Sequence, residues 1–230
     1  MLSIKNLKFG HGSHNVVAEN TVFGSGIYGV IGPSGSGKST FLNTLAGFHK
    51  CESGSATFED RDLLTQRVED RPIAMLFQSN NLFPHLTIFR NVALAMTSRR
   101  WLTKVQQQHV SDALDRVGLS GFENRKPGEL SGGQQSRAAL ARVLLQRKPI
   151  LLLDEPFAAL GPAMRNEMLD LVKEIAETDN QIVLLVTHSP DDALRICDQT
   201  IFVSNKRLWL AGDTKIALQN IPSEMQDYFG

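Results

Sequence analysis

The feature that most constrains this chain is the glycine-rich segment 32–40, Gly-Pro-Ser-Gly-Ser-Gly-Lys-Ser-Thr, which fits the pattern G-x-x-x-x-G-K-[ST]. The short apolar segment 27–31 precedes it and has the composition of a strand. Residues 40–46 follow it and predict a helix, which Gly47 ends as a C-terminal cap. A strand, a glycine-rich loop and a helix N-terminus form the context that this pattern requires.

The residue types in this loop suit the binding of a triphosphate. Gly35 and Gly37 lack side chains, so backbone N–H groups can point toward phosphate oxygens. The helix that starts near Lys38 adds unpaired N–H groups and the positive end of its dipole. Lys38 would supply a full charge to the outer phosphates, and the Ser39 hydroxyl would bind Mg²⁺. The alternative is a glycine-rich turn that matches by chance, so the loop needs support from the rest of the chain.

The composition sets broad limits on function. Hydrophobic residues make up 42% of the 230 and charged residues 21%, which is ordinary for a soluble globular protein. The formal net charge of +0 gives no electrostatic reason to expect binding to nucleic acid or anionic lipid. Cys51 and Cys197 lie far apart without metal-ligand spacing, so we expect a reduced, cytoplasmic chain. No segment approaches the ~18 apolar residues that span a bilayer, so work at a membrane would require another chain as an anchor.

The order of apolar segments predicts one α/β domain over residues 1–230. Strands alternate with helices in 1–78 and again in 146–230, which predicts a three-layer core around a parallel sheet. The segment 79–145 breaks this alternation and contains an amphipathic stretch at 105–117. We therefore interpret 79–145 as a helical subdomain inserted in the core.

Other strands are predicted at both ends of the chain. The segments 2–9, 16–23 and 56–58 suggest antiparallel strands that make the N-terminal edge of a mixed sheet. Near the C-terminus, Thr200–Val203 and Leu208–Leu210 are interpreted as edge strands.

Two carboxylates follow a predicted buried strand. The aliphatic run Ile150–Leu153 leads directly into Asp154 and Glu155. The carboxyl ends of parallel strands are where ligands bind in such sheets. We assign Asp154 to a metal ion and Glu155 to the water that attacks the γ-phosphate. The alternative is a solvated acidic turn at the end of a strand.

A second glycine-rich helix start, Leu-Ser-Gly-Gly-Gln at 130–134, lies in the inserted helical part. Ser131 is placed to cap the helix, and the glycines behind it would form a second anion cradle. One nucleotide cannot easily use both cradles of one chain unless the subdomain folds back. A second copy facing the first would complete each site, which predicts a head-to-tail dimer with C₂ symmetry.

Together these segments resemble the ATP-binding cassette (ABC) transporter ATPases over essentially the whole chain. The order of motifs is the family's: Walker A at 32–39, the Q-loop at Gln78, the signature at 130–134, Walker B at 150–154 and a switch histidine at His188. The resemblance implies a P-loop NTPase fold, ATP and Mg²⁺ as ligands, and a dimer through the nucleotide sites.

The resemblance also implies a role for each matching residue. Gln78 would touch Mg²⁺ and the attacking water, and His188 would contact the γ-phosphate and that water, beside Glu155. Metal ligands would be Ser39, Gln78 and Asp154. The expected ATP-binding residues are Phe9, Gly32, Pro33, Ser34, Gly35, Ser36, Gly37, Lys38, Ser39, Thr40, Ser131, Gly132, Gly133 and Gln134.

Two positions need separate mention. The family commonly stacks adenine on an aromatic residue ahead of the Walker A loop; Phe9 is our candidate, with His11 behind it, and a strand-end core residue is the alternative for Phe9. After Walker B the family usually reads Ser-Ala-Leu-Asp, but this chain has Ala-Ala-Leu-Gly at 158–161. Gly161 lacks the carboxylate that helps to link the two sites across the dimer, so communication between them is in doubt.

Within the family, the chain is most similar to free-standing importer subunits, in particular to the thiamine importer ATPases, on the segments 75–87 and 154–162. Ferric iron or molybdate importers are the alternative, and further alternatives are a soluble, non-transport ABC ATPase and a degenerate cassette that binds ATP mainly to signal. The expected partners are a second copy, permease subunits that dock on a groove around 79–95, and a periplasmic solute-binding protein. We expect the chain at the cytoplasmic face of a bacterial inner membrane, held there by the permease.

Overall fold

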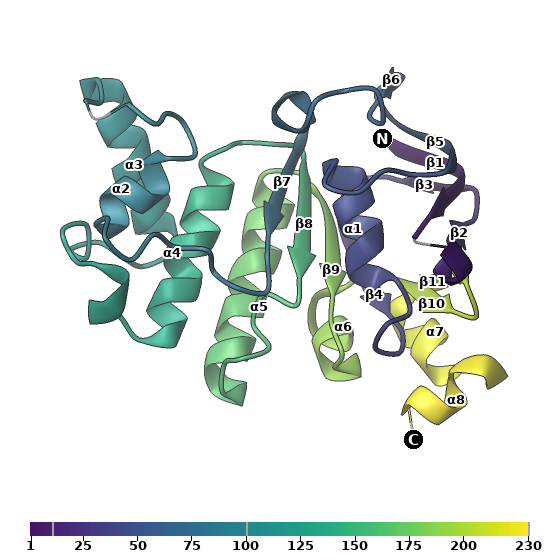
Figure 1. The fold of residues 1–230 in the computed structure, drawn as a ribbon. Coiled ribbons are helices and arrows are strands. Elements are labelled where there is room, and N and C mark those ends of the chain that lie inside the picture. The colour runs from purple at the N-terminus through teal and green to yellow at the C-terminus, as the bar shows by residue number, and fades with distance from the viewer. Residues whose placement is uncertain (11, 100, 230) are drawn as a thin grey trace.

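The computed structural model describes residues 1–10, 12–99 and 101–229, which form one mixed sheet with helices on both faces (Figure 1). The strands are β1 Leu2–Phe9, β2 Val16–Ala18, β3 Thr21–Phe23, β4 Gly26–Ile31, β5 Ser53–Phe58, β6 Arg61–Asp62, β7 Ile73–Leu76, β8 Ile150–Asp154, β9 Ile182–Val186, β10 Gln199–Ser204 and β11 Arg207–Asp213. The helices are α1 Lys38–Ala46, α2 Ile88–Ala93, α3 Lys104–Arg116, α4 Gly132–Leu144, α5 Pro162–Thr178, α6 Pro190–Ile196, α7 Thr214–Gln219 and α8 Ser223–Phe229, with short 3₁₀ turns at Gly12–His14, Val68–Asp70 and Pro127–Glu129.

The parallel part of the sheet carries the glycine-rich loop. Strands β10, β4, β9, β8 and β7 pair in parallel in this order, so β4 lies between β10 and β9. Successive side chains of a strand point to opposite faces. In β8, Leu151 and Leu153 therefore join the core beneath α4 and α5, while Ile150 and Leu152 join the core around α1. The predicted layers, with helices on both faces of parallel strands, are confirmed.

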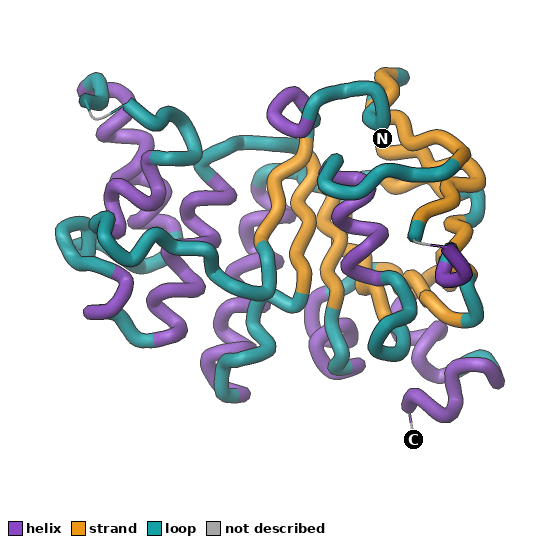
Figure 2. The backbone as a smooth tube through the Cα atoms, in the orientation of Figure 1, coloured by secondary structure: helices purple, strands orange, loops and turns teal. Residues whose placement is uncertain are grey.

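The antiparallel part lies at the N-terminal end of the chain, as predicted. Strand β1 pairs antiparallel with β2, β3 and β5. Its apolar side chains and the apolar face of α1 share one core, in which Phe9 and Phe41 lie with ring centroids 5.5 Å apart. Helix α1 is thus enclosed between the antiparallel strands and the parallel ones (Figure 2).

The prediction that Thr200–Val203 and Leu208–Leu210 are edge strands is wrong. Strand β10 pairs with β4, and β11 pairs with both β10 and β2, so the two strands join the parallel and antiparallel parts. The described sheet ends instead at β6 and β7. The alternation of apolar residues indicates which face of a strand is buried. Whether the strand lies at the edge or in the centre of a sheet depends on its pairing with strands from distant parts of the sequence.

Three α-helices lie between β7 and β8. Helix α3 buries Val110, Ala113 and Leu114, as the amphipathic pattern predicts. Thr103 and Gln106 form a capping box at its start. Helix α4 packs against α2, α3 and β7. In Figure 1 these helices lie beside the parallel strands, on the side of β7.

Candidate functional site

The carboxyl ends of the parallel strands bring the predicted site residues together. The registers align Val30 of β4 with Val186 of β9, and Val186 with Asp154 of β8. The residues that follow these strand ends are the glycine-rich loop, Glu155 and the segment containing His188. Side chains separated by more than 100 positions in sequence therefore meet at one edge.

The glycine-rich loop needs glycine for steric reasons. A Cβ atom on Gly32 would lie 2.1 Å from the carbonyl oxygen of Val203 in the adjacent β10. Gly37 has φ +105° and precedes the first residue of α1, so it takes a left-handed conformation that favours glycine. Helix α1 begins at Lys38 and ends with Gly47 at φ +93°, which confirms the predicted C-terminal cap.

Lys38 is buried at the base of this loop, with 4% of its surface exposed. Its Nζ donates hydrogen bonds to the carbonyl oxygens of Gly32 at 2.6 Å and Pro33 at 2.8 Å. Burial lowers the pKa of Lys38, and the nearby carboxylates of Glu155 and Asp154 oppose that shift. The ammonium group is thus held at the loop with few solvent contacts, as a phosphate-binding group requires.

Ser39 and Asp154 form a pair of oxygen donors. Ser39 Oγ donates to Asp154 Oδ1 at 2.8 Å, which joins the start of α1 to the end of β8. Asp154 is 9% exposed; burial raises its pKa, the hydrogen bond from Ser39 opposes this, and the neighbouring Glu155 raises it further. A hydroxyl and a carboxylate are the hard oxygen ligands that Mg²⁺ takes together with water and phosphate oxygens, so the residues present fit this ion.

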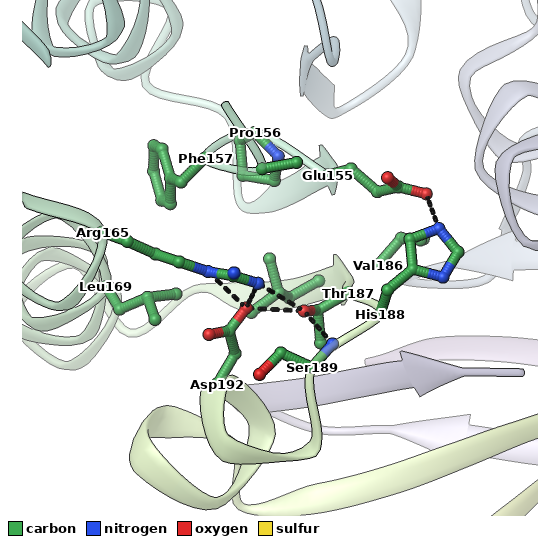
Figure 3. Close-up of a pocket in the computed structure, with 12 residues that line it drawn as sticks. Glu155, Pro156, Phe157, Arg165, Leu169, Val186, Thr187, His188, Ser189 and Asp192 are labelled. Carbon is green, nitrogen blue, oxygen red and sulfur yellow. Dashed lines mark hydrogen bonds and ion pairs between the residues drawn. The ribbon is translucent and has the colours of Figure 1, made fainter. Parts of the chain in front are cut away.

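Glu155 and His188 face each other across the mouth of the site. His188 Nε2 contacts Glu155 Oε1 (Figure 3). Glu155 has φ +46°, a sparsely populated conformation for a residue with a side chain, and its N–H donates to Val186 O at 3.2 Å. Both residues line a cavity of about 180 Å³ with Ser34, Gly35, Gly37, Lys38, Ser39 and Thr40.

A second cavity of about 300 Å³ lies behind this pair, and a polar cluster lines it. Asp192 of α6 pairs with Arg165 of α5 and accepts a 2.6 Å hydrogen bond from Thr187 Oγ1 (Figure 3). Ser189 N–H donates to Thr187 Oγ1 at 3.1 Å. The Asp192 carboxylate therefore holds Thr187 directly, and the Thr187 hydroxyl in turn holds Ser189 on the other side of His188. This cluster could not be predicted from the sequence, because no local pattern links Arg165 to Asp192.

The signature segment lies away from the glycine-rich loop. Ser131 caps α4 as predicted, in a capping box with Gln134, and both Ser131 and Gly132 are exposed. A Cβ atom on Gly133 would lie 1.8 Å from Met164 Sδ of α5, so a side chain here would have to displace the flexible, exposed Met164 side chain. Figure 1 shows α4 and α1 on opposite sides of β7 and β8. Among the described residues, those lining the cavity at the glycine-rich loop include none from the signature.

Two predicted site residues lie elsewhere than expected. The prediction that Phe9 stacks on adenine needs correction, because its side chain is 0% exposed in the core around α1 and offers no free ring face. His11, the second candidate, lies outside the described residues. Gln78 is exposed just beyond β7, at the correct edge, but in the described part of the chain it lines neither cavity.

Comparison with known proteins identifies the family. The sequence profile of the ABC transporter family matches residues 19–158, which include the glycine-rich loop, the signature and Asp154. The chain belongs to the ABC transporter family. Proteins of this family bind ATP, and the chain has the fold and motif set of its transport ATPases.

Curated relatives match the whole chain. The "Thiamine import ATP-binding protein ThiQ" of Ruegeria sp. (strain TM1040) is 49% identical over 230 residues and covers 100% of both chains. The protein of the same name from Brucella abortus biovar 1 (strain 9-941) is 42% identical, over 100% of this chain and 95% of the relative.

Solved ABC cassettes have the same fold. A dimeric structure of the ATP-binding cassette MJ0796 in a post-hydrolysis state, bound to ADP and Pi, superposes with a TM-score of 0.76 at 29% identity. The alignment covers 90% of this chain and 96% of the cassette. Within the residues described for the present ABC protein, no helix is both long and apolar enough to cross a membrane.

The glycine at position 161 gives a prediction about stability. Gly161 is the N-cap of α5 without a side-chain hydrogen bond, and a Cβ atom there would have no heavy atom within 4 Å. Gly161→Asp and Gly161→Asn should each raise the free energy of unfolding by a few tenths of a kcal/mol, whereas Gly161→Ala should not, because it adds no capping oxygen. Urea unfolding checks this, and an equal gain for alanine would refute the capping argument.

Proposed function

We propose that this chain is the ATP-hydrolysing subunit of a bacterial thiamine importer. The observation that carries hydrolysis is the convergence of Lys38, the Ser39–Asp154 pair and the Glu155–His188 pair at one sheet edge. Thiamine is proposed as the solute because curated relatives that align over the full chain carry that name. Importers of ferric iron, molybdate or another small solute are the alternative.

Each residue of the site would have a distinct task. Lys38 and the backbone N–H groups of the glycine-rich loop bind and orient the phosphates. Glu155 accepts a proton from the attacking water, and His188 holds that carboxylate and the water in line. Ser39 and Asp154 would hold Mg²⁺, which neutralises phosphate charge when bound. Gln78 would join the metal site from the end of β7.

We propose that the working form is a head-to-tail homodimer. The exposed Ser131 and Gly132 at the N-terminus of α4 supply anion-binding donors that the glycine-rich loop of the same chain does not use. A facing copy would bring Ser131, Gly132, Gly133 and Gln134 to the phosphates. The dimeric state of the similar cassette MJ0796 supports this arrangement.

Mixing two inactive variants tests the dimer. Lys38→Met disables the glycine-rich loop, and Ser131→Arg blocks the signature. If each site takes one loop from each chain, a mixed dimer of these variants contains one intact site and regains hydrolysis. If both elements act within one chain, every site carries a defect and the mixture stays inactive, which would refute the head-to-tail site. Each variant alone is the control.

The segment 79–95 would receive the permease at the cytoplasmic face of the inner membrane. Asn91 is fully buried; its Oδ1 accepts from Phe83 N–H at 2.7 Å, and its Nδ2 lies within 3.2 Å of the Phe83 and Leu86 carbonyls. Arg142 donates to the carbonyls of Asn80 and Asn81. These bonds fix the loop while leaving Phe83 46% exposed, which suits an apolar helix of a partner.

This use of 79–95 supports treating 79–145 as a helical subdomain separate from the core segments 1–78 and 146–230. A periplasmic solute-binding protein would complete the importer on the other side of the membrane. The proposed function is tested by uptake of labelled thiamine in a strain lacking this chain, with molybdate and ferric iron uptake as controls. Normal thiamine uptake in that strain would refute thiamine as the imported solute. If the chain hydrolyses ATP fully but is not recovered with the membranes of any strain, a soluble ABC ATPase is favoured.

A further inference from the structure

The C-terminal helix α8 packs against the elements that form the nucleotide site. Met225 is 0% exposed and packs with Ile31 at the end of β4, Ala193 of α6 and Phe202 of β10. Ser204 Oγ at the end of β10 donates to the carbonyl oxygen of Glu224 at 3.3 Å. The helix is thus anchored on the strand that leads into the glycine-rich loop.

This anchoring brings Tyr228 to the switch histidine. The Tyr228 hydroxyl lies 3.3 Å from the carbonyl oxygen of His188 and 3.5 Å from its Nδ1. The other ring nitrogen, Nε2, contacts Glu155. The imidazole therefore has a carboxylate at one nitrogen and a phenol at the other; Glu155 follows β8, and Tyr228 belongs to α8.

We propose that Tyr228 is a positioning residue for His188, holding its ring and backbone so that Nε2 faces Glu155 and the attacking water. This inference rests on the proposed role of His188 in hydrolysis. It adds a residue of the C-terminal helix to the machinery, although Tyr228 itself lines neither cavity in the described structure.

The hydrogen-bonding chemistry supports this role. A carboxylate only accepts, so Nε2 carries a hydrogen where it contacts Glu155. A neutral ring then has a bare Nδ1, which accepts, and the one hydrogen of the Tyr228 hydroxyl is shared between this nitrogen at 3.5 Å and the His188 carbonyl oxygen at 3.3 Å. Burial raises the pKa of Tyr228, and the charge of Glu155 raises it further, so the phenol keeps its hydrogen at neutral pH. A partner that fixes the second nitrogen orients a histidine and selects its tautomer.

The test compares the chain's two tyrosines. Tyr228→Phe keeps the ring that packs on the core and removes only the hydroxyl. We expect kcat for ATP in the full-length chain to fall about five- to tenfold, as for loss of one hydrogen bond to a reacting group, with KM within about twofold. Tyr28→Phe is the matched control, because its hydroxyl also bonds to backbone atoms, those of Gly24, away from His188. It should leave kcat unchanged.

Two further measurements separate positioning from a structural role. The ¹⁵N shift of His188 Nδ1 should change in Tyr228→Phe, because that nitrogen loses its donor, but not in Tyr28→Phe. Tyr228→Phe should also cost nothing more in a His188→Ala background. Parent kcat and parent ring shifts in Tyr228→Phe would overturn the proposal while leaving the function intact. Parent kcat in His188→Ala would instead overturn the role of His188, and the positioning proposal with it.

Discussion

Replacing Glu155 with glutamine is expected to lower steady-state ATP hydrolysis by about 10²- to 10³-fold, the usual loss when a general base is removed. Glutamine has nearly the same shape and keeps a group that can reach His188, but its amide cannot take a proton from water. The side chain is only 16% exposed, and among the described residues that line the cavity at the glycine-rich loop it is the one carboxylate. ATP binding should remain, because the glycine-rich loop and Lys38 are unchanged.

The same variant should accumulate as a dimer in the presence of ATP, since hydrolysis is the step proposed to reopen it. Size-exclusion chromatography with and without ATP measures this, and calorimetry measures ATP affinity. Glu177→Gln, at an exposed position near the end of α5, is the matched control and should behave as the parent. Hydrolysis by Glu155→Gln at the parent rate would show that the role assigned to Glu155 is wrong.

Lys38→Met should weaken ATP binding by about 10²-fold or more, because it removes the charge that faces the phosphates, and charge-assisted contacts contribute about 1.5–3 kcal/mol each. The variant loses two hydrogen bonds to the carbonyls of Gly32 and Pro33 but also the burial cost of the charge, so its stability should stay close to that of the parent. Burial lowers the pKa of Lys38 in the folded chain, so the amine costs stability at pH values below its ordinary pKa, including neutral pH. Methionine fills the space without that cost.

Calorimetry and thermal unfolding together check this pair of effects. Lys148→Met is the control: Lys148 Nζ donates to the Arg71 carbonyl at 2.8 Å, away from the nucleotide site, so its loss should leave ATP affinity unchanged. Parent ATP affinity in Lys38→Met would refute the phosphate role. Weak binding together with a lower unfolding temperature would mean that the substitution damages the loop, not only its charge.

Local chemistry made much of the site predictable. Ser131 occupies the helix start that the sequence rules assign to it, and Gly47 the helix end. The two carboxylates follow β8 as expected, because aliphatic runs of this length form buried strands. Such predictions hold where a residue's task is set by its neighbours in the chain.

Features that depend on distant residues were not predictable in this way. Phe9 is our candidate for stacking on adenine, but its buried ring packs against Phe41 in the core. The pairing of Arg165 with Asp192 has no sequence signal, since ion pairs between two helices depend on how those helices cross. Tyr228 reaches His188 only because α8 packs on Ile31 and Ala193.

The central place of β10 and β11 has a consequence for how this protein is made. Glu19, just after β2, and Arg207 of β11 form a 2.5 Å ion pair across 188 positions of sequence, and β4 gains its second neighbour only from β10. A ribosome must therefore synthesise the chain through β10 and β11 before the loop around Gly32 acquires its final surroundings. Until then the early strands have open edges, which favour association with other chains. The ability to bind nucleotide should therefore emerge only after β10 has left the ribosome.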